Sequence, residues 1–197
     1  RKHGMSHFLM DWSRSNCQSE KIKQLILEDY NRQIIKDTNQ NVELERIFEH
    51  FEEAGIETLL VKGATTKEAY PQDYMRSMHD MDMMIHERDF KKASKMMKSL
   101  GFEEFYDHEK HLVFTKKPWI IVEMHRKLIP GGEVSHEYFN DIWPLCEPYQ
   151  DYKNVVRMNL EDSYVFVVIH LIRHFKFTGI EIRDVLDIYL LNEKYQK

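Results

Sequence analysis

Apolar residues recur at three- and four-residue steps between residues 19 and 51. This spacing puts them on one helix face and predicts two amphipathic helices. We expect a break between the helices at residues 37–41, because the polar run Asp-Thr-Asn-Gln-Asn is typical of a turn. Ala54 and Gly55 end the second helix. The first 18 residues lack a clear period, which predicts irregular chain or a short helix.

Short apolar runs follow, separated by turns. Strands are expected at residues 56–61 and 81–85, with a turn at Lys62-Gly63-Ala64 and a helix over 65–70 between them. Residues 87–100 predict a helix that Gly101 ends. Three further strand candidates are residues 102–106, 112–115 and 119–124.

Beyond Pro130-Gly131-Gly132 the pattern becomes helical, with helices expected at residues 138–143, 160–177 and 182–191. Helices, then a β-α-β-α-β-β-β block, then helices predict an α+β fold. We divide the chain into an N-terminal helical segment (1–55), an α+β core (56–128) and a C-terminal helical region (129–197). Since the chain opens on an arginine and stops directly after an apolar helical run, we expect it to be part of a longer protein.

Two aspartates lie in the apolar segment Met-His-Asp80-Met-Asp82-Met-Met-Ile. Asp82 falls within the strand expected at 81–85, and Asp80 directly precedes it. Aspartate is disfavoured in strands, and side chains two apart point to the same face. Glu123, in Ile-Ile-Val-Glu-Met-His, can join them if the two strands are neighbours. Three carboxylates suit a hard dication such as Mg²⁺ or Mn²⁺, as in two-metal phosphoryl transfer. The alternative is a solvent-facing strand edge that carries acids.

The Lys62-Gly63 turn leads from a strand into a helix. A glycine lets backbone approach a ligand closely, and a helix N-terminus offers N–H groups to phosphate. Thr65 and Thr66 could add hydroxyls. Arg76 could bind phosphate or brace an acid. The alternative is an ordinary strand-to-helix turn with a surface lysine.

The chain contains eleven histidines. His125 shares a strand face with Glu123 and is a candidate to orient a ligand or to donate to phosphate. His111 is a weaker candidate. His170 and His174 lie four apart on a helix but lack the glutamate of an H-E-x-x-H motif, so we expect packing or hydrogen bonding there.

Three charged residues, Arg183, Asp184 and Asp187, lie on the last expected helix. We interpret them as a solvated face or a helix-internal ion pair of small energetic value.

The net charge is −5 and the sequence pI is about 6.1, so the chain lacks the strongly basic character of a dedicated DNA-binding protein. The two cysteines form no C-x-x-C pair, which argues against a disulfide framework or a thiolate zinc site. No apolar run reaches the length of a membrane span, and the first residues lack a signal-peptide core. We expect a cytoplasmic protein without a membrane partner.

These motifs, taken in order, resemble the uncharacterised nucleotidyltransferase family of the DNA polymerase beta-like superfamily, from about residue 40 to the end. The segments that carry the resemblance are Lys62-Gly63-Ala64, Tyr70-Pro71, Arg76 to Asp82, Leu100-Gly101-Phe102, Val122 to His125, His170 to Phe175 and Arg183 to Asp187. The resemblance implies a mixed-sheet nucleotidyltransferase core flanked by N- and C-terminal helices. It also implies that Asp80, Asp82 and Glu123 are catalytic Mg²⁺ ligands and that the Lys62-Gly63 turn meets a triphosphate.

The implied reaction transfers a nucleoside monophosphate from an NTP, such as ATP, to an acceptor hydroxyl and releases pyrophosphate. The acceptor stays open between a protein side chain, an RNA end, a sugar and a small molecule. Ala64 stands where the superfamily has serine, so a phosphate-binding hydroxyl must come from Thr65 or Thr66, or is missing. Two alternatives remain: a catalytically silent nucleotide-binding module, and a hydrolase whose histidines bind zinc, iron or manganese.

Overall fold

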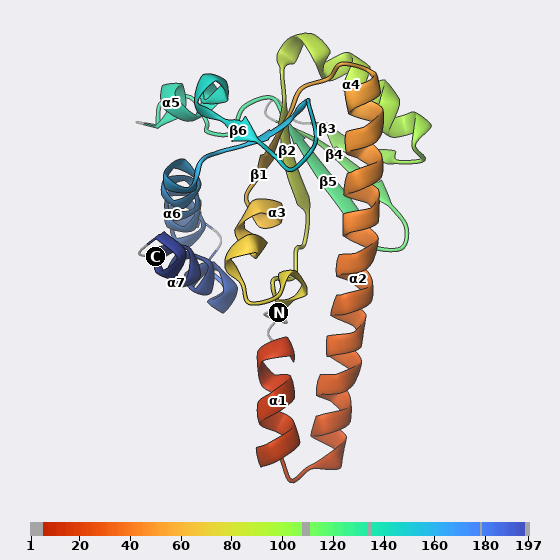
Figure 1. Ribbon diagram of the computed structural model, residues 1–197, viewed down its shortest axis with the longest axis vertical. Coiled ribbons are helices and arrows are strands. Elements are labelled where there is room, and N and C mark those ends of the chain that lie inside the picture. Colours follow the sequence, from red (N-terminus) through yellow and green to blue (C-terminus); the bar gives the residue numbers. More distant parts are fainter. Residues whose placement is uncertain (1–5, 108–110, 134, 178, 196–197) are drawn as a thin grey trace.

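A seven-stranded mixed sheet forms the centre of the molecule, in the order β3-β4-β5-β2-β1-β7-β6 (Figure 1). The computed structural model describes residues 6–107, 111–133, 135–177 and 179–195. Neighbouring strands are antiparallel except for the pairs β2–β5 and β1–β7, which are parallel. The strands are β1 (Thr58–Val61), β2 (Met81–Ile85), β3 (Glu103–Asp107), β4 (His111–Lys116), β5 (Ile120–His125), β6 (Glu147–Pro148) and β7 (Val155–Arg157).

Helices surround the sheet. They are α1 (Ser6–Asn16), α2 (Glu20–Glu53), α3 (Gly63–Thr66), α4 (Glu87–Ser99), α5 (His136–Asn140), α6 (Leu160–Phe177) and α7 (Ile182–Tyr195). Short 3-10 helices are η1 (Lys67–Ala69), η2 (Asp73–Met75) and η3 (Trp143–Leu145). The α+β class is confirmed, and β2 and α6 have the bounds that the sequence predicts.

The predicted break at residues 37–41 is wrong, because α2 runs unbroken for 34 residues. Its polar residues make tertiary contacts where a turn was expected. Lys67 Nζ lies 2.8 Å from Asp37 Oδ1 and 2.9 Å from Asn41 Oδ1, and Gln40 donates to the carbonyl oxygen of Met78 at 3.4 Å. Since neither glycine nor proline interrupts this stretch, the helix continues through it.

The region after residue 130 is less purely helical than predicted. The helix expected at 138–143 is divided between α5 and η3. Strands β6 and β7 were not predicted, because runs of two and three residues carry no readable alternation. β7 pairs with β1 and so extends the sheet beyond the block expected at 56–128.

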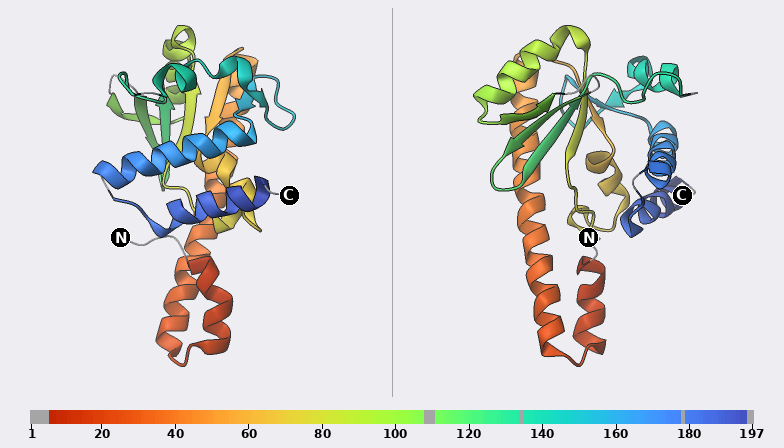
Figure 2. Two further views of the ribbon diagram at one scale, coloured as in Figure 1. Left: turned by 90° about the vertical axis from the view of Figure 1, so that its left-hand side faces the viewer. Right: turned by 180° about the vertical axis from the view of Figure 1, so that it is seen from behind.

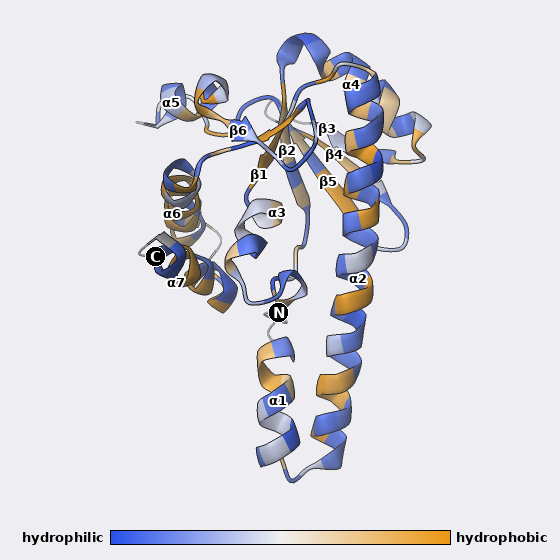
Figure 3. Cartoon of the chain, viewed as in Figure 1, coloured by the Kyte–Doolittle hydropathy of each residue, from blue (hydrophilic) through white to orange (hydrophobic). Residues whose placement is uncertain are grey.

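The two faces of the sheet bury different hydrophobic clusters. Met81, Met83 and Ile85 of β2 pack with residues of α2 and α4, whereas Met84 packs on the opposite side with Phe166 of α6. Figures 1 and 2 show α2 and α4 on one side of the sheet and α6 on the other, and Figure 3 shows the hydrophobic character of the strands between them. Asp82, the one polar residue of β2, shares the face of Met84 and therefore faces α6.

The N-terminal half of α2 extends beyond the sheet and pairs with α1 as a helical hairpin (Figure 2). Among the described helices, none combines the length and the apolar character that crossing a membrane would require.

Candidate active site

The register of three central strands gathers the predicted acidic residues. β2 and β5 are parallel neighbours, and Asp82 lies directly opposite Glu123. On the other side of β2, Val61 of β1 lies opposite Asp82, so Lys62 follows next to the same carboxylate. The condition under which Glu123 can join the aspartates, that the two acid-bearing strands are neighbours, is met.

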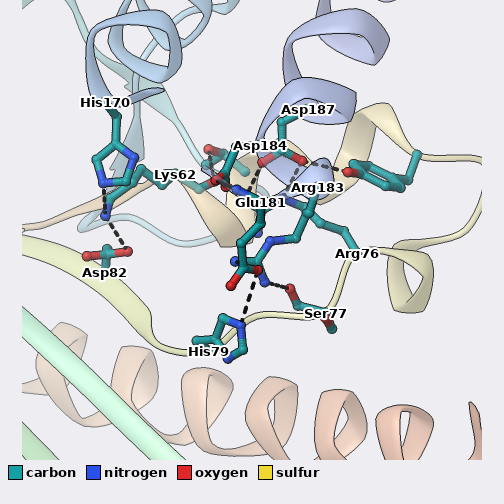
Figure 4. A network of polar contacts seen from close by, with 12 residues as sticks. Lys62, Arg76, Ser77, His79, Asp82, His170, Glu181, Arg183, Asp184 and Asp187 are labelled. Carbon is teal, nitrogen blue, oxygen red and sulfur yellow. Dashed lines mark hydrogen bonds and ion pairs between the residues drawn. The ribbon is translucent and has the colours of Figure 1, made fainter. Parts of the chain in front are cut away.

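An unusual backbone conformation begins the turn after β1. Lys62 has φ 47° and ψ −116°, a region that residues with a side chain rarely adopt. Its ammonium group lies 3.1 Å from Asp82 Oδ2 and 3.1 Å from His170 Nε2 (Figure 4). At the next position, a Cβ on Gly63 would lie 2.8 Å from Arg76 Nη1, so only glycine fits without a shift.

The three carboxylates differ in their electrostatic state. Burial alone would raise the pKa of Asp82, but the ammonium of Lys62 and the hydrogen bond from His125 hold it well below its usual range. Burial and the charge of Asp82 raise the pKa of Asp80. The same two causes, together with the charge of Asp80, raise the pKa of Glu123. Like charges are therefore crowded at one place, and a bound dication would relieve their repulsion.

Two histidines position these charged groups. His125 Nε2 lies 2.8 Å from Asp82 Oδ1 and 3.6 Å from Glu123 Oε2. Burial and the nearby Lys62 lower the pKa of His170 to about 2, so its imidazole is neutral and accepts a hydrogen bond from the lysine ammonium. The expectation of hydrogen bonding at His170 is confirmed, and the His174 ring lies 4.2 Å from it, centroid to centroid.

A second buried ion pair, between Arg76 and Asp187, forms the wall of the site opposite Lys62. Arg76 donates from Nε to Asp187 Oδ1 at 2.9 Å and from Nη2 to Oδ2 at 2.6 Å, and the Tyr70 hydroxyl donates to Oδ1 at 2.6 Å. Asp187 is only 3% exposed, so the expected solvated face is wrong for this residue. No local sequence pattern marks Asp187 as buried, since Val185 and Tyr189 on either side of it are exposed; the docking of α7 against Arg76 and Tyr70 buries it. Of the two roles left open for Arg76, the structure shows the bracing of an acid.

The start of α7 and the residues before it complete this wall (Figure 4). Arg183 donates from Nη1 to the carbonyl oxygen of Ser77 at 2.7 Å, and Asp184 Oδ2 accepts from the backbone N–H of Glu181 at 2.8 Å. The Arg183 side chain is 13% exposed, which also contradicts a solvated face. Glu181 carried no sequence signal, because its contacts depend on how α7 folds back over residues 76–79.

Most of these groups line one cavity of about 710 Å³, whereas Tyr70, Ser77 and His125 lie outside its described lining. Its lining residues are Lys62, Gly63, Arg76, Met78, His79, Asp80, Asp82, Glu123, Val167, His170, Leu171, His174, Gly179, Glu181, Arg183, Asp184 and Asp187. Neither Thr65 nor Thr66 belongs to the described lining. The Thr65 hydroxyl donates to the Lys62 carbonyl oxygen at 2.8 Å, and Thr66 is buried.

A second cavity of about 420 Å³ adjoins the first and shares Lys62, Glu123, His170 and His174 with it. Helix α2 fixes the segment that leads to the acids, since Lys36 Nζ donates to the Met78 carbonyl oxygen at 2.6 Å. The acidic pair is thus held from both sides, by the long helix and by α7.

Comparison with known proteins places the chain in a family. Residues 3–197 match the family model described as uncharacterised nucleotidyltransferase. A comparison with curated protein sequences finds no match.

Solved structures show the same fold at low sequence identity. The antibiotic-resistance factor ANT(2″)-Ia, in its complex with adenylyl-2″-tobramycin, is similar with a TM-score of 0.59 and 8% identity, over 80% of this chain and 90% of that one. Its solution structure gives a TM-score of 0.58 and 10% identity, over 81% and 85% of the two chains. The lincomycin-bound lincosamide antibiotic adenylyltransferase LnuA gives a TM-score of 0.51 and 17% identity, over 76% and 94%.

The resemblance drawn from the sequence motifs is confirmed over nearly the whole chain, and the neighbours share the mixed-sheet nucleotidyltransferase fold. The chain belongs to the uncharacterised nucleotidyltransferase family.

Proposed function

We propose that this chain transfers a nucleoside monophosphate from an NTP to an acceptor hydroxyl, with release of pyrophosphate. One observation carries the proposal: the Lys62-Gly63 turn and the carboxylates of Asp80, Asp82 and Glu123 all open onto one cavity. Phosphate-binding and metal-binding groups are thus within reach of a single substrate.

Asp80, Asp82 and Glu123 form the donor set that would hold Mg²⁺ or Mn²⁺. All three offer carboxylate oxygens, which hard dications prefer, and the raised pKa values of Asp80 and Glu123 reflect a crowding of negative charge that such an ion would neutralise. When bound, the metal supplies positive charge to the triphosphate and to the leaving pyrophosphate.

Cationic groups on the turn would bind the phosphates. Lys62 would exchange Asp82 for a phosphate oxygen, and His170 would keep its ammonium aimed at the cavity through the 3.1 Å hydrogen bond. Asp187 accepts hydrogen bonds from Nε and Nη2 of Arg76. The third guanidinium nitrogen, Nη1, lies next to Gly63, where it could donate a hydrogen bond to phosphate. Such preorganised donors stabilise the charge that develops during transfer.

Glu123 is the candidate proton acceptor. The acceptor oxygen would attack the α-phosphorus, the bond from that phosphorus to the bridging oxygen would break, and the hydroxyl proton would pass to the Glu123 carboxylate. The Glu123 carboxylate lines both cavities, so it is placed to take a proton from a hydroxyl that approaches through either one. His125 would position both Asp82 and Glu123, through Nε2 at 2.8 Å and 3.6 Å.

The second cavity is the candidate acceptor site, because Glu123 lies on the boundary between the two cavities. The structural neighbours hold adenylyl-2″-tobramycin or lincomycin, which supports a small hydroxyl-bearing molecule as one acceptor class. A protein side chain, an RNA end and a sugar are the other classes to test.

A catalytically silent nucleotide-binding module is the second candidate function. Ala64 offers no hydroxyl, and the Thr65 hydroxyl is already donated to the Lys62 carbonyl oxygen. This module would bind an NTP with its metal but would not release pyrophosphate.

The test is a thermal-shift panel of ATP, GTP, CTP and UTP, each with Mg²⁺, Mn²⁺ or EDTA. A nucleotide at about 100 times its Kd stabilises the folded state by about 2.7 kcal/mol. We expect stabilisation that needs the metal and is lost in Asp80→Asn and Asp82→Asn. The matched control is Asp141→Asn, which removes an exposed carboxylate and should shift like the wild type. No shift with any NTP would contradict the proposal.

Pyrophosphate release then separates the two candidate functions. It is measured with the stabilising NTP in the presence of pooled acceptors of each class. Release that stops in Glu123→Gln supports transfer. Tight, metal-dependent binding without release with any acceptor class favours the silent module.

A further inference from the structure

Two histidines and a glutamate lie together on the sheet face that carries Asp82. In the antiparallel β4–β5 pair His111 is directly opposite His125, and Glu123 is two residues before His125 on the same strand. Alternation therefore gives all three side chains the same face. One candidate ligand atom from each lies within 4.8 Å of the other two.

This cluster differs chemically from the carboxylates. Imidazole suits zinc and other transition metals, whereas Mg²⁺ selects oxygen ligands. Two histidines and one glutamate that leave a coordination position open form a donor set used by catalytic zinc sites. Among the described residues, Asp80, Asp82 and Glu123 do not form a group as tight as this one.

We propose that His111, Glu123 and His125 bind a transition-metal dication, with Zn²⁺ as the best match, at a site separate from the Asp80–Asp82 pair. The site opens onto the second cavity, which all three residues line. The short separation of the ligand atoms means that small side-chain rotations would bring them to coordination distance.

The position of Glu123 gives this metal a regulatory consequence, which rests on the proposed function. Glu123 lines both cavities and is the candidate proton acceptor. A zinc ion held through Glu123 would remove this base and would stand where the acceptor hydroxyl has to approach. Zinc would therefore inhibit transfer even in excess Mg²⁺.

Zinc titration of the chelator-treated chain against a chromophoric zinc indicator tests the site directly. We expect one tight equivalent per chain in the wild type, and at least tenfold weaker binding in His111→Ala, Glu123→Gln and His125→Gln. Asp80→Asn should keep the wild-type affinity. The matched control is His174→Ala, because His174 lines the same cavity but lies outside the cluster.

Cobalt provides a second readout that does not depend on activity. Co²⁺ in a His/Glu/His site should give visible absorption that His111→Ala abolishes, while the far-UV circular dichroism of the variant stays unchanged. Equal zinc affinity in the wild type and His111→Ala would overturn the proposal, as would an equal loss in His174→Ala. Neither titration contains a nucleotide, so failure here is distinguishable from failure of the proposed transfer.

Discussion

Two buried ion pairs face each other across the main cavity, and they are built differently. Arg76 and Asp187 form two hydrogen bonds in a fork, and Tyr70 adds a third to the same carboxylate. Lys62 and Asp82 form a single ion-pair contact of 3.1 Å, and the lysine ammonium also donates to His170. Three hydrogen bonds therefore fix the Arg76–Asp187 pair, whereas the Lys62–Asp82 pair has a single contact that another ion could replace.

The difference separates a structural pair from a functional one. Burying two charges is unfavourable unless the geometry and the remaining hydrogen bonds compensate, and Asp187 meets that condition while it fixes α7 to the segment before β2. Lys62 sits on a strained turn, and its contact with Asp82 is one that ligands could replace: a dication in place of the ammonium beside Asp82, and a phosphate in place of Asp82 beside the ammonium. We infer that stability is concentrated in the first pair and reactivity in the second.

Asp187→Ala should give the largest loss of stability. It leaves the Arg76 guanidinium buried without its counter-ion, which costs about 3–5 kcal/mol. Urea unfolding followed by circular dichroism measures the change. The control is Arg88→Ala, which breaks an exposed ion pair with Asp89 and should cost less than about 0.5 kcal/mol. Equal losses in the two variants would contradict the structural role of the Arg76–Asp187 pair.

Gly63→Ala should destabilise the packing of the Lys62-Gly63 turn against Arg76 and Met78. The new methyl group would meet Arg76 Nη1 at 2.8 Å and Met78 Sδ at 3.1 Å, and such overpacking costs about 1–3 kcal/mol. Gly131→Ala is the matched control, because its Cβ would find nothing nearer than His136 Nε2 at 4.0 Å. The same unfolding experiment should show Gly131→Ala close to the wild type. A tolerated Gly63→Ala would mean that the turn is looser than the structure shows.

The sequence singled out Lys62 and Asp82 as candidate site residues, although it did not predict their contact, whereas it misread Asp187. Asp82 and Lys62 stand beside apolar strand residues, where a charge is conspicuous, and their neighbours in sequence already suggest one face of a sheet. Asp82 lies close to Glu123 because β2 and β5 are neighbouring strands, and this adjacency was the one condition that the sequence argument needed.

Asp187 was misread because its partner is 111 positions away in the chain. A charged residue on an amphipathic helix is usually solvated, and only the docking of α7 turns this one inward. The continuous α2 was missed for the same reason: Asp37 and Gln40 are typical of a turn until Lys67 and Met78 are brought against them. In both cases long-range contacts decided against the local pattern.

Lys62→Gly and Lys62→Met together separate backbone strain from charge at the functional pair. Both variants remove the ammonium group from Asp82, but only glycine adopts φ 47° without strain. We expect Lys62→Gly to be more stable than Lys62→Met by about 1 kcal/mol. Thermal unfolding of the two variants side by side checks this order. The reverse order would contradict the assignment of backbone strain to this turn.

Asp80→Asn should give the smallest effect, and its sign depends on pH and on metal. Because burial and Asp82 raise the pKa of Asp80 in the folded state, ionisation of Asp80 destabilises the fold as pH rises from its ordinary pKa of 3.8 through the raised value. The asparagine variant escapes this loss, so its Tm should match the wild type in acid and exceed it by about 2 °C at neutral pH in EDTA. Added Mg²⁺ should reverse the order, since only the wild type keeps the carboxylate that would hold the ion. A variant less stable than the wild type in EDTA at neutral pH would contradict this expectation. It would show that Lys62 stabilises the Asp80 carboxylate more than Asp82 repels it. Lys62 and the aspartates would then form a stabilising ionic network without a metal, as Arg76 and Asp187 do.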